Sequence, residues 1–139
     1  MSNSVNLIEP IRVVTEIDHV RIQNLLSRQP SAMVSNLEEV LDSADLVRSE
    51  DVPVNVVTMN SQVLVADIKT GEERQLTLCY PADVDPASGA ISVLSPVGSS
   101  LLGLPVGAVA RWDAPDGSCV GTKVQAIVFQ PEANGDYLA

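Results

Sequence analysis

The segment 91–107, ISVLSPVGSSLLGLPVG, constrains the fold of this chain more than any other stretch. The alternation of its first residues predicts a strand. Ser95 predicts a helix N-cap, and Pro96 suits the first helical position, where no amide hydrogen is needed. Gly103 stands where a helix end favours a left-handed residue. The segment therefore predicts a strand, a short apolar helix and a turn, and the apolar helix face must pack on another element.

Composition narrows the possible functions. The chain has 139 residues, of which 45% are hydrophobic and only four are aromatic. These values predict one compact unit, or a small domain with an appendage, around an aliphatic core, and they argue against a deep aromatic-walled pocket. The net charge is −10, and no cluster of basic residues is present. We therefore expect no direct binding to nucleic acid, and we expect a neutral or basic protein as partner.

The sequence also carries signals about compartment. The first 14 residues, MSNSVNLIEPIRVV, lack the basic start and apolar run of a signal peptide, and no segment approaches the ~18 apolar residues that span a bilayer. Cys79 and Cys119 lie far apart in strand-like, apolar surroundings, which predicts buried free thiols. We therefore expect a cytoplasmic protein with no membrane partner.

The N-terminal third predicts helices. Residues 5–14 suggest an extended segment, after which Thr15 and Asp18 have the spacing of a capping box. A helix is expected over residues 16–27, with Ile17, Val20 and Asn24 on one stripe, and Pro30 follows it.

A second helix is expected from a cap at Ser35, with Glu38 three residues later. Apolar residues then recur at helical spacing as far as Val47. Two short helices with a brief connection predict an antiparallel hairpin, which we assign to a first domain of residues 1–50.

The remaining residues, 51–139, predict a second domain with a different periodicity. Residues 54–130 alternate as about five strands, with turns at 69–72 (KTGE) and 113–117 (DAPDG) and the one short helix of the opening segment. The overall prediction is an α+β chain, in which a helical hairpin precedes an antiparallel sheet.

Residues that could support catalysis are sparse. His19 is the only histidine, and nothing in the sequence pairs it with either cysteine, so no nucleophilic or zinc site is expected. The residues SPVGSSLLG lack the GK[ST] of a phosphate loop. An acidic row could attract a metal, but it is more typical of a solvated helix face; its members are Glu38, Glu39, Asp42 and Asp45. We expect no metal, no cofactor and no enzymatic activity.

Three motifs together carry a family resemblance. They are VVTMNSQV (56–63), ISVLSPVGSSLLGLPVG (91–107) and FQPEANGDY (129–137). In order and spacing they resemble the regulators of nucleoside diphosphate kinase (Rnk), relatives of the Gre transcript-cleavage factors. The resemblance implies an N-terminal coiled coil, a C-terminal domain of FKBP-like fold, and binding to RNA polymerase near its secondary channel.

The same resemblance separates this chain from the cleavage factors. Gre factors carry acidic side chains at the tip of a long coiled coil, but the expected tip here, residues 27–34 (SRQPSAMV), has no acid. Helices of ten to fourteen residues extend only about 15–20 Å. We therefore expect a protein that competes with Gre-type factors for polymerase without stimulating cleavage. Two alternatives remain: a direct regulator of nucleoside diphosphate kinase, and a prolyl isomerase, to which the scarcity of aromatic residues is unfavourable.

The partner-binding residues implied by the resemblance belong to the opening segment. They are Ser95, Pro96, Val97, Gly98, Ser99, Leu101, Leu102 and Gly103. The exposed side of this short helix is expected to contact polymerase, whereas the leucines are equally compatible with packing of the helix on the sheet.

Overall fold

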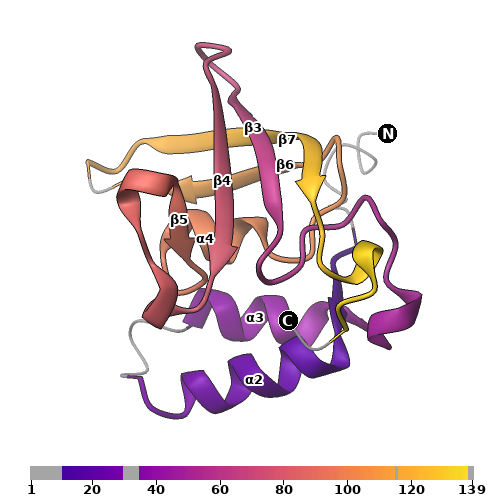
Figure 1. The fold of residues 1–139 in the computed structure, drawn as a ribbon. Helices are drawn as coiled ribbons and strands as arrows, with labels where there is room; N and C mark the ends of the chain where they lie inside the picture. Colours follow the sequence, from indigo (N-terminus) through magenta and orange to yellow (C-terminus); the bar gives the residue numbers. More distant parts are fainter. Residues whose placement is uncertain (1–10, 30–34, 115, 138–139) are drawn as a thin grey trace, which may run out of the picture.

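The chain has a mixed α+β fold in which a curled sheet lies over two short helices (Figure 1). The computed structural model describes residues 11–29, 35–114 and 116–137. Five strands form the main sheet in the order β5-β4-β3-β7-β6. Their bounds are β3 Gln62–Asp67, β4 Glu73–Cys79, β5 Ala90–Ser92, β6 Val109–Asp113 and β7 Cys119–Phe129.

Most neighbours in this sheet are antiparallel, as expected, but one pair differs. β4 and β5 run parallel, because the connection between them passes through two 3₁₀ turns, η3 (Pro81–Asp83) and η4 (Pro86–Ser88), before the chain returns. The predicted turn between β3 and β4 is present: the carboxylate of Asp67 accepts hydrogen bonds from the backbone N–H groups of Lys69 and Thr70. The register of β3 against β7 shifts twice, and such bulges bend a strand and increase its twist.

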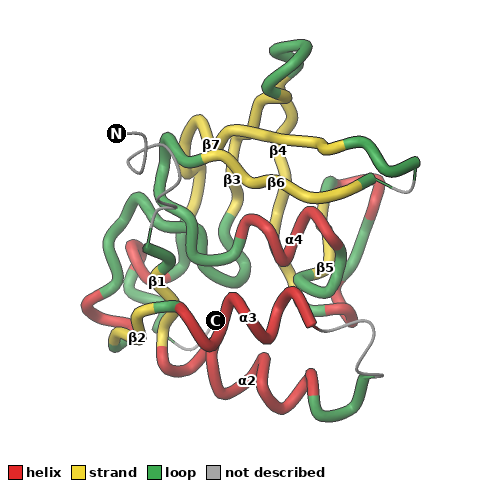
Figure 2. The backbone as a smooth tube through the Cα atoms, turned by 180° about the vertical axis from the view of Figure 1, so that it is seen from behind, coloured by secondary structure: helices red, strands yellow, loops and turns green. Residues whose placement is uncertain are grey.

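The short helix α4 (Pro96–Leu101) forms as its sequence predicts. The Ser95 hydroxyl accepts the N–H of Gly98 at 3.0 Å, and Pro96 occupies the first turn. Gly103 adopts φ +82°, the left-handed conformation expected just beyond the helix end. Figure 2 shows α4 between the sheet and the two N-terminal helices.

Helix α2 (Glu16–Leu26) begins after the three-residue strand β1 (Val13–Thr15). Thr15 caps it, as predicted, by accepting the N–H of Asp18 at 3.1 Å. The predicted stripe, however, is wrong: Val20 is 58% exposed and Asn24 is exposed, while the buried face consists of Asp18, Ile22 and Leu26. On the buried face, Ile22 and Leu26 join the aliphatic core, and the carboxylate of Asp18 accepts the N–H of Met59.

Helix α3 (Ser35–Ser43) is shorter than expected. Leu37 and Leu41 are buried, as the spacing predicts, but the helix ends at Ser43 and Val47 lies in strand β2 (Asp45–Val47). The chain leaves the helix because β2 pairs in parallel with β1. The predicted cap at Ser35, the segment 5–10 and the core of the expected tip, residues 30–34, lie outside the described residues or side chains.

One aliphatic cluster contains buried residues from both halves of the chain. It joins Ile22, Leu26, Leu37 and Leu41 of the helices with residues of the sheet and of α4; these include Val57, Met59, Val63, Leu78, Val93, Leu101, Leu102 and Val124. None of the described helices is long and apolar enough to cross a bilayer.

Both cysteines are free, but only one matches the prediction. Cys79 is buried and its thiol hydrogen-bonds to the carbonyl of Ile91. Cys119 is exposed, because it begins β7 directly after the 113–117 turn, where the sheet reaches solvent.

Candidate functional site

The three sequence motifs meet in space around the segment 56–61. Val57 donates its N–H to the carbonyl of Leu104 and accepts the N–H of Gly103, which joins the first motif to the second. The side-chain amide of Gln130 donates to the carbonyl of Val56 at 2.8 Å, which joins the first motif to the third. Two segments, each more than 40 residues away in sequence, therefore contact this one short loop.

A chain of hydroxyl groups ends on a buried carboxylate at this junction. The backbone N–H of Thr58 donates to Ser61 Oγ at 2.9 Å, and the two hydroxyls lie 2.8 Å apart. The Thr58 hydroxyl donates to Glu132 Oε1 at 2.8 Å. Because Thr58 has only one hydroxyl proton, Ser61 must supply the hydrogen between the two hydroxyls. Glu132 lies at the start of the 3₁₀ turn η5 (Glu132–Asn134) and is buried.

A second carboxyl group enters the same junction from α2. Asp18 is 2% exposed, and its Oδ2 accepts the N–H of Met59 at 3.2 Å. Burial raises its pKa to about 7, and the negative charge of Glu132 adds to this effect. The Met59 N–H, Thr15 and Arg21 act in the opposite direction. Asp18 thus connects α2 to the sheet half of the chain and titrates near neutral pH.

Tyr80 follows β4 and faces the same group of charges. Its hydroxyl is buried and has no hydrogen-bond acceptor among the described residues, while the side chain of Arg21 lies beside it and lowers its pKa. Burial raises its pKa, and the neighbouring Asp18 raises it further, so the hydroxyl keeps its proton. A buried donor without an acceptor is unfavourable by about 1–3 kcal/mol.

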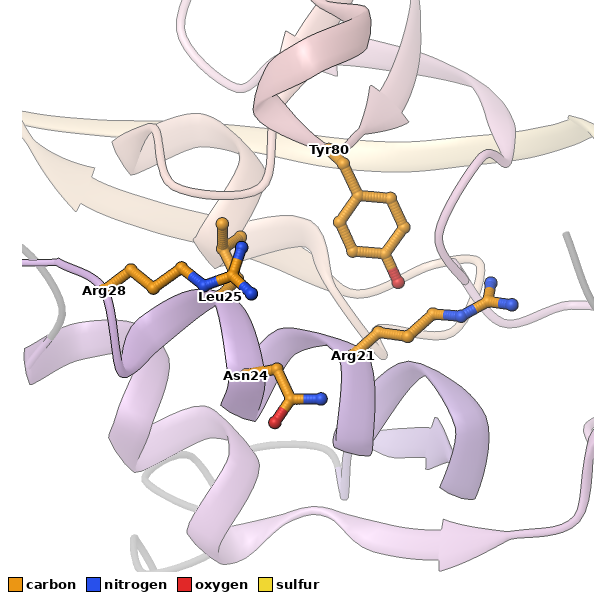
Figure 3. Close-up of a pocket in the computed structure, with 5 residues that line it drawn as sticks. All are labelled: Arg21, Asn24, Leu25, Arg28 and Tyr80. Carbon is orange, nitrogen blue, oxygen red and sulfur yellow. The ribbon is translucent and has the colours of Figure 1, made fainter.

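The ring of Tyr80 forms one wall of a surface hollow, and α2 forms the other (Figure 3). The hollow has a volume of about 410 Å³ and is lined by Arg21, Asn24, Leu25, Arg28 and Tyr80. We call it the arginine hollow. Arg28 lies in the turn after α2, where its N–H donates to the carbonyl of Leu25. None of the described residues that line the hollow is acidic.

Most of the partner-binding residues expected from the sequence are inside the protein. Gly98, Ser99, Leu101, Leu102 and Gly103 are buried. Leu101 and Leu102 belong to the aliphatic cluster, so packing of the helix on the sheet accounts for both.

The other members of that set reach the surface at least partly. Ser95 and Val97 are half-buried, and Pro96 is exposed. Val97 also borders a smaller hollow of about 140 Å³ on the sheet, opposite the half-buried Trp112. These three residues therefore form the accessible corner of α4.

Sequence reasoning missed the buried acids. The sequence places Asp18 in a capping box and Glu132 in the third motif, and neither pattern predicts that the side chain is buried. The sequence of α2 does contain a signal of burial. Asp18, Ile22 and Leu26 follow one another at intervals of four residues, so they lie on the same face of the helix. An acid at a core position of a helix indicates a partner inside the fold.

The acidic row is divided between two elements. Glu38, Glu39 and Asp42 lie on α3, whereas Asp45 lies on β2, and all four are exposed. In the described part of the chain, no group of three or more potential ligands is arranged to hold a metal ion.

Comparison with known proteins gives consistent matches. Residues 52–128 match the family described as "Transcription elongation factor, GreA/GreB, C-term". The "Regulator of nucleoside diphosphate kinase" of Escherichia coli (strain K12) is 39% identical over 132 residues, covering 93% of this chain and 97% of that protein. The "Transcription elongation factor GreA" of Chloroherpeton thalassium is 35% identical over 89 residues, covering 64% of this chain and 56% of its own length.

A solved structure extends the likeness to the fold. The "Prokaryotic transcription elongation factor GreA/GreB from Nitrosomonas europaea" superimposes with a TM-score of 0.73 and 36% sequence identity. The match covers 87% of this chain and 100% of that one. The likeness in structure therefore extends beyond residues 52–128.

Proposed function

Because the chain belongs to the GreA/GreB family of transcription elongation factors, we propose that it is a non-enzymatic regulator that binds RNA polymerase near the secondary channel. The observation that carries the proposal is the match of residues 52–128 to the C-terminal domain of these factors. We assign docking to the domain of residues 51–139, whose fold we take to be FKBP-like, with Ser95, Pro96 and Val97 at the contact. With polymerase as partner, we expect the chain to act in the cytoplasm.

The N-terminal helices support occupation of the enzyme rather than stimulation of cleavage. We take α2 and α3 to be the counterpart of a coiled coil, as a short antiparallel hairpin. α2 has 11 residues and α3 has nine, so each is about 14–17 Å long. Leu26 and Leu37, which flank the expected tip, are both part of the aliphatic cluster. Helices of this length, joined by a segment whose sequence has no acids, supply neither the reach nor the ligands for a catalytic magnesium ion.

A competition experiment tests the proposal. Labelled full-length protein is titrated with core RNA polymerase, and an acid-tipped Gre factor is then added as competitor. We expect saturable binding, displacement by the Gre factor, and no increase in cleavage of a backtracked transcript.

Absence of binding to polymerase overturns the proposal. So does retention by nucleoside diphosphate kinase in place of polymerase, which would support the activity suggested by the name of the Escherichia coli relative. Acceleration of cis–trans exchange in a proline peptide would contradict the non-enzymatic assignment.

A further inference from the structure

Helix α4 is too short to be stable on its own, and its two ends are held in different ways. Isolated helices of fewer than ~12 residues are marginal in water, and α4 has six residues. Its N-terminal end is specified locally, by the Ser95 cap and by Pro96. Its C-terminal end is held by Arg12, which lies 88 residues before Ser100 in the sequence. The geometry of α4 therefore depends on a long-range contact as well as on a local one.

Arg12 holds the carbonyl groups at the end of α4. Its Nη1 atom donates to the carbonyl of Ser100 at 2.9 Å and to that of Leu102 at 2.8 Å. The N–H of the next residue, Val13, donates to the carbonyl of Gly103 at 3.0 Å. The last carbonyls of a helix lack partners within it and carry partial negative charge, so a guanidinium group is a favourable donor for them. Two adjacent residues thus supply the donors for three carbonyls.

The same residue joins α4 to the strands that carry the N-terminal helices. A Cβ atom at Gly103 would lie 3.0 Å from Arg12 Cβ, so the two segments pack closely. The carbonyl of Arg12 accepts the N–H of Asp45 in β2 at 2.8 Å. β1 starts at the next residue and leads into α2, while β2 follows α3. Arg12 therefore lies where the base of both helices meets the end of α4.

The other end of α4 is the accessible corner, Ser95, Pro96 and Val97, at which we place docking. Six helical residues are about 9 Å long, so a tilt or fraying at the C-terminal end moves this corner. A partner binds a preorganised surface more tightly than one that it must order. We propose that Arg12 is a positioning residue for docking, because it holds the end of α4 and so fixes the orientation of the corner relative to β1 and β2. For RNA polymerase as the partner, the inference rests on the proposed function.

NMR tests the positioning without polymerase. The full-length protein is compared with Arg12→Met, which keeps a long side chain without donors, and with Arg12→Lys, which keeps the charge. The amides of Gly98 and Ser99 report on the corner, because they donate to the side-chain and backbone oxygens of Ser95. Relative to the amides of β3 and β7, Arg12→Met should speed their hydrogen exchange about fivefold or more, and Arg12→Lys should speed it less.

Two control variants separate positioning from changes in charge and in stability. Arg48→Met makes the same change in charge at the exposed ion pair with Glu50, and it should leave the corner amides unchanged. Val63→Ala destabilises the fold from a fully buried position in β3 and leaves Arg12 in place. It should not speed the exchange of the corner amides selectively.

The same variants are then tested for binding to core RNA polymerase, at a temperature at which each is folded. Arg12→Met should raise the dissociation constant about tenfold and Arg12→Lys about threefold, whereas both controls should change it less than twofold. If Val63→Ala loses as much affinity as Arg12→Met, the effect of Arg12 is one of stability alone and the proposal is wrong. If Arg12→Met does not fold, the effects expected for Arg12→Lys decide by the same measurements.

The two measurements distinguish this proposal from the proposed function. Equal binding of polymerase by all folded variants overturns the positioning role and leaves the proposed function standing. Absence of binding by the wild type overturns the proposed function. In that case, selective exchange at the corner amides of Arg12→Met supports the positioning of α4 by Arg12, and unchanged exchange overturns it.

Discussion

At the scale of single residues, Asp18 shows how folding changes the chemistry of a side chain. It occupies a core position on α2, where water is excluded and Glu132 is the neighbouring acid. The hydrogen bond from the Met59 N–H, together with Thr15 and Arg21, compensates only partly for lost solvation. The pKa of Asp18 therefore rises from its usual 3.8 to about 7.

This shift predicts how stability depends on pH. The folded protein binds the Asp18 proton more tightly than the unfolded chain, so the contribution of Asp18 to the free energy of unfolding decreases as pH rises from about 4 to about 7 and is constant above that. Asp18→Asn keeps an acceptor for the Met59 N–H without the charge. In urea unfolding, the variant should match the wild type at pH 4 and exceed it at pH 8 by as much as about 4 kcal/mol.

Two further variants serve as controls for this prediction. Glu132→Gln removes a charge that adds to the effect of burial on the pKa of Asp18, so the decrease in stability should end at a lower pH and be smaller in total. Glu38→Gln, on the exposed side of α3, should leave the profile unchanged. A difference between Asp18→Asn and wild type that is the same at every pH would contradict the assignment.

At the scale of elements, local sequence signals predicted helix α4 correctly, whereas they did not predict which face of α2 is buried. The cap at Ser95, Pro96 and the left-handed Gly103 specify α4 within a few residues of chain, and the sequence predicted all three. In α2, the apolar residues are spread around the helix, so composition does not identify the inner side. The inner side is the one on which Ile22 and Leu26 join the core cluster and Asp18 meets the N–H of Met59, 41 residues away.

The orientation of α2 can be tested by a matched pair of truncations. Ile22 is fully buried, and Ile22→Ala should decrease the free energy of unfolding by about 2–5 kcal/mol because it leaves a cavity. Val20→Ala should change it by less than about 0.5 kcal/mol, since Val20 is mostly exposed and alanine favours helix. The reverse order of the two effects in urea unfolding would restore the stripe predicted from the sequence.

At the scale of the whole molecule, the sequence predicted the strands but not how distant parts join. Periodicity and turn residues predicted about five strands and one helix in residues 54–130, and the structure has that set. The junction depends on side-chain bonds across long separations: 74 residues from Thr58 to Glu132, and 88 from Arg12 to Ser100. No local pattern encodes such pairs. The buried acids and the arginine hollow therefore could not be predicted from the sequence and were found only in the three-dimensional structure.

The last prediction concerns the expected tip between α2 and α3. Replacing Ser31 and Met33 by Asp or Glu adds acids to the expected tip without lengthening either helix. Because α2 and α3 keep their 11 and nine residues, the new carboxylates gain no reach. The variant should bind core polymerase within about twofold of wild type and should not stimulate cleavage of a backtracked transcript. A Gre factor in the same assay provides the positive control, and robust cleavage by the variant would show that reach does not limit this chain.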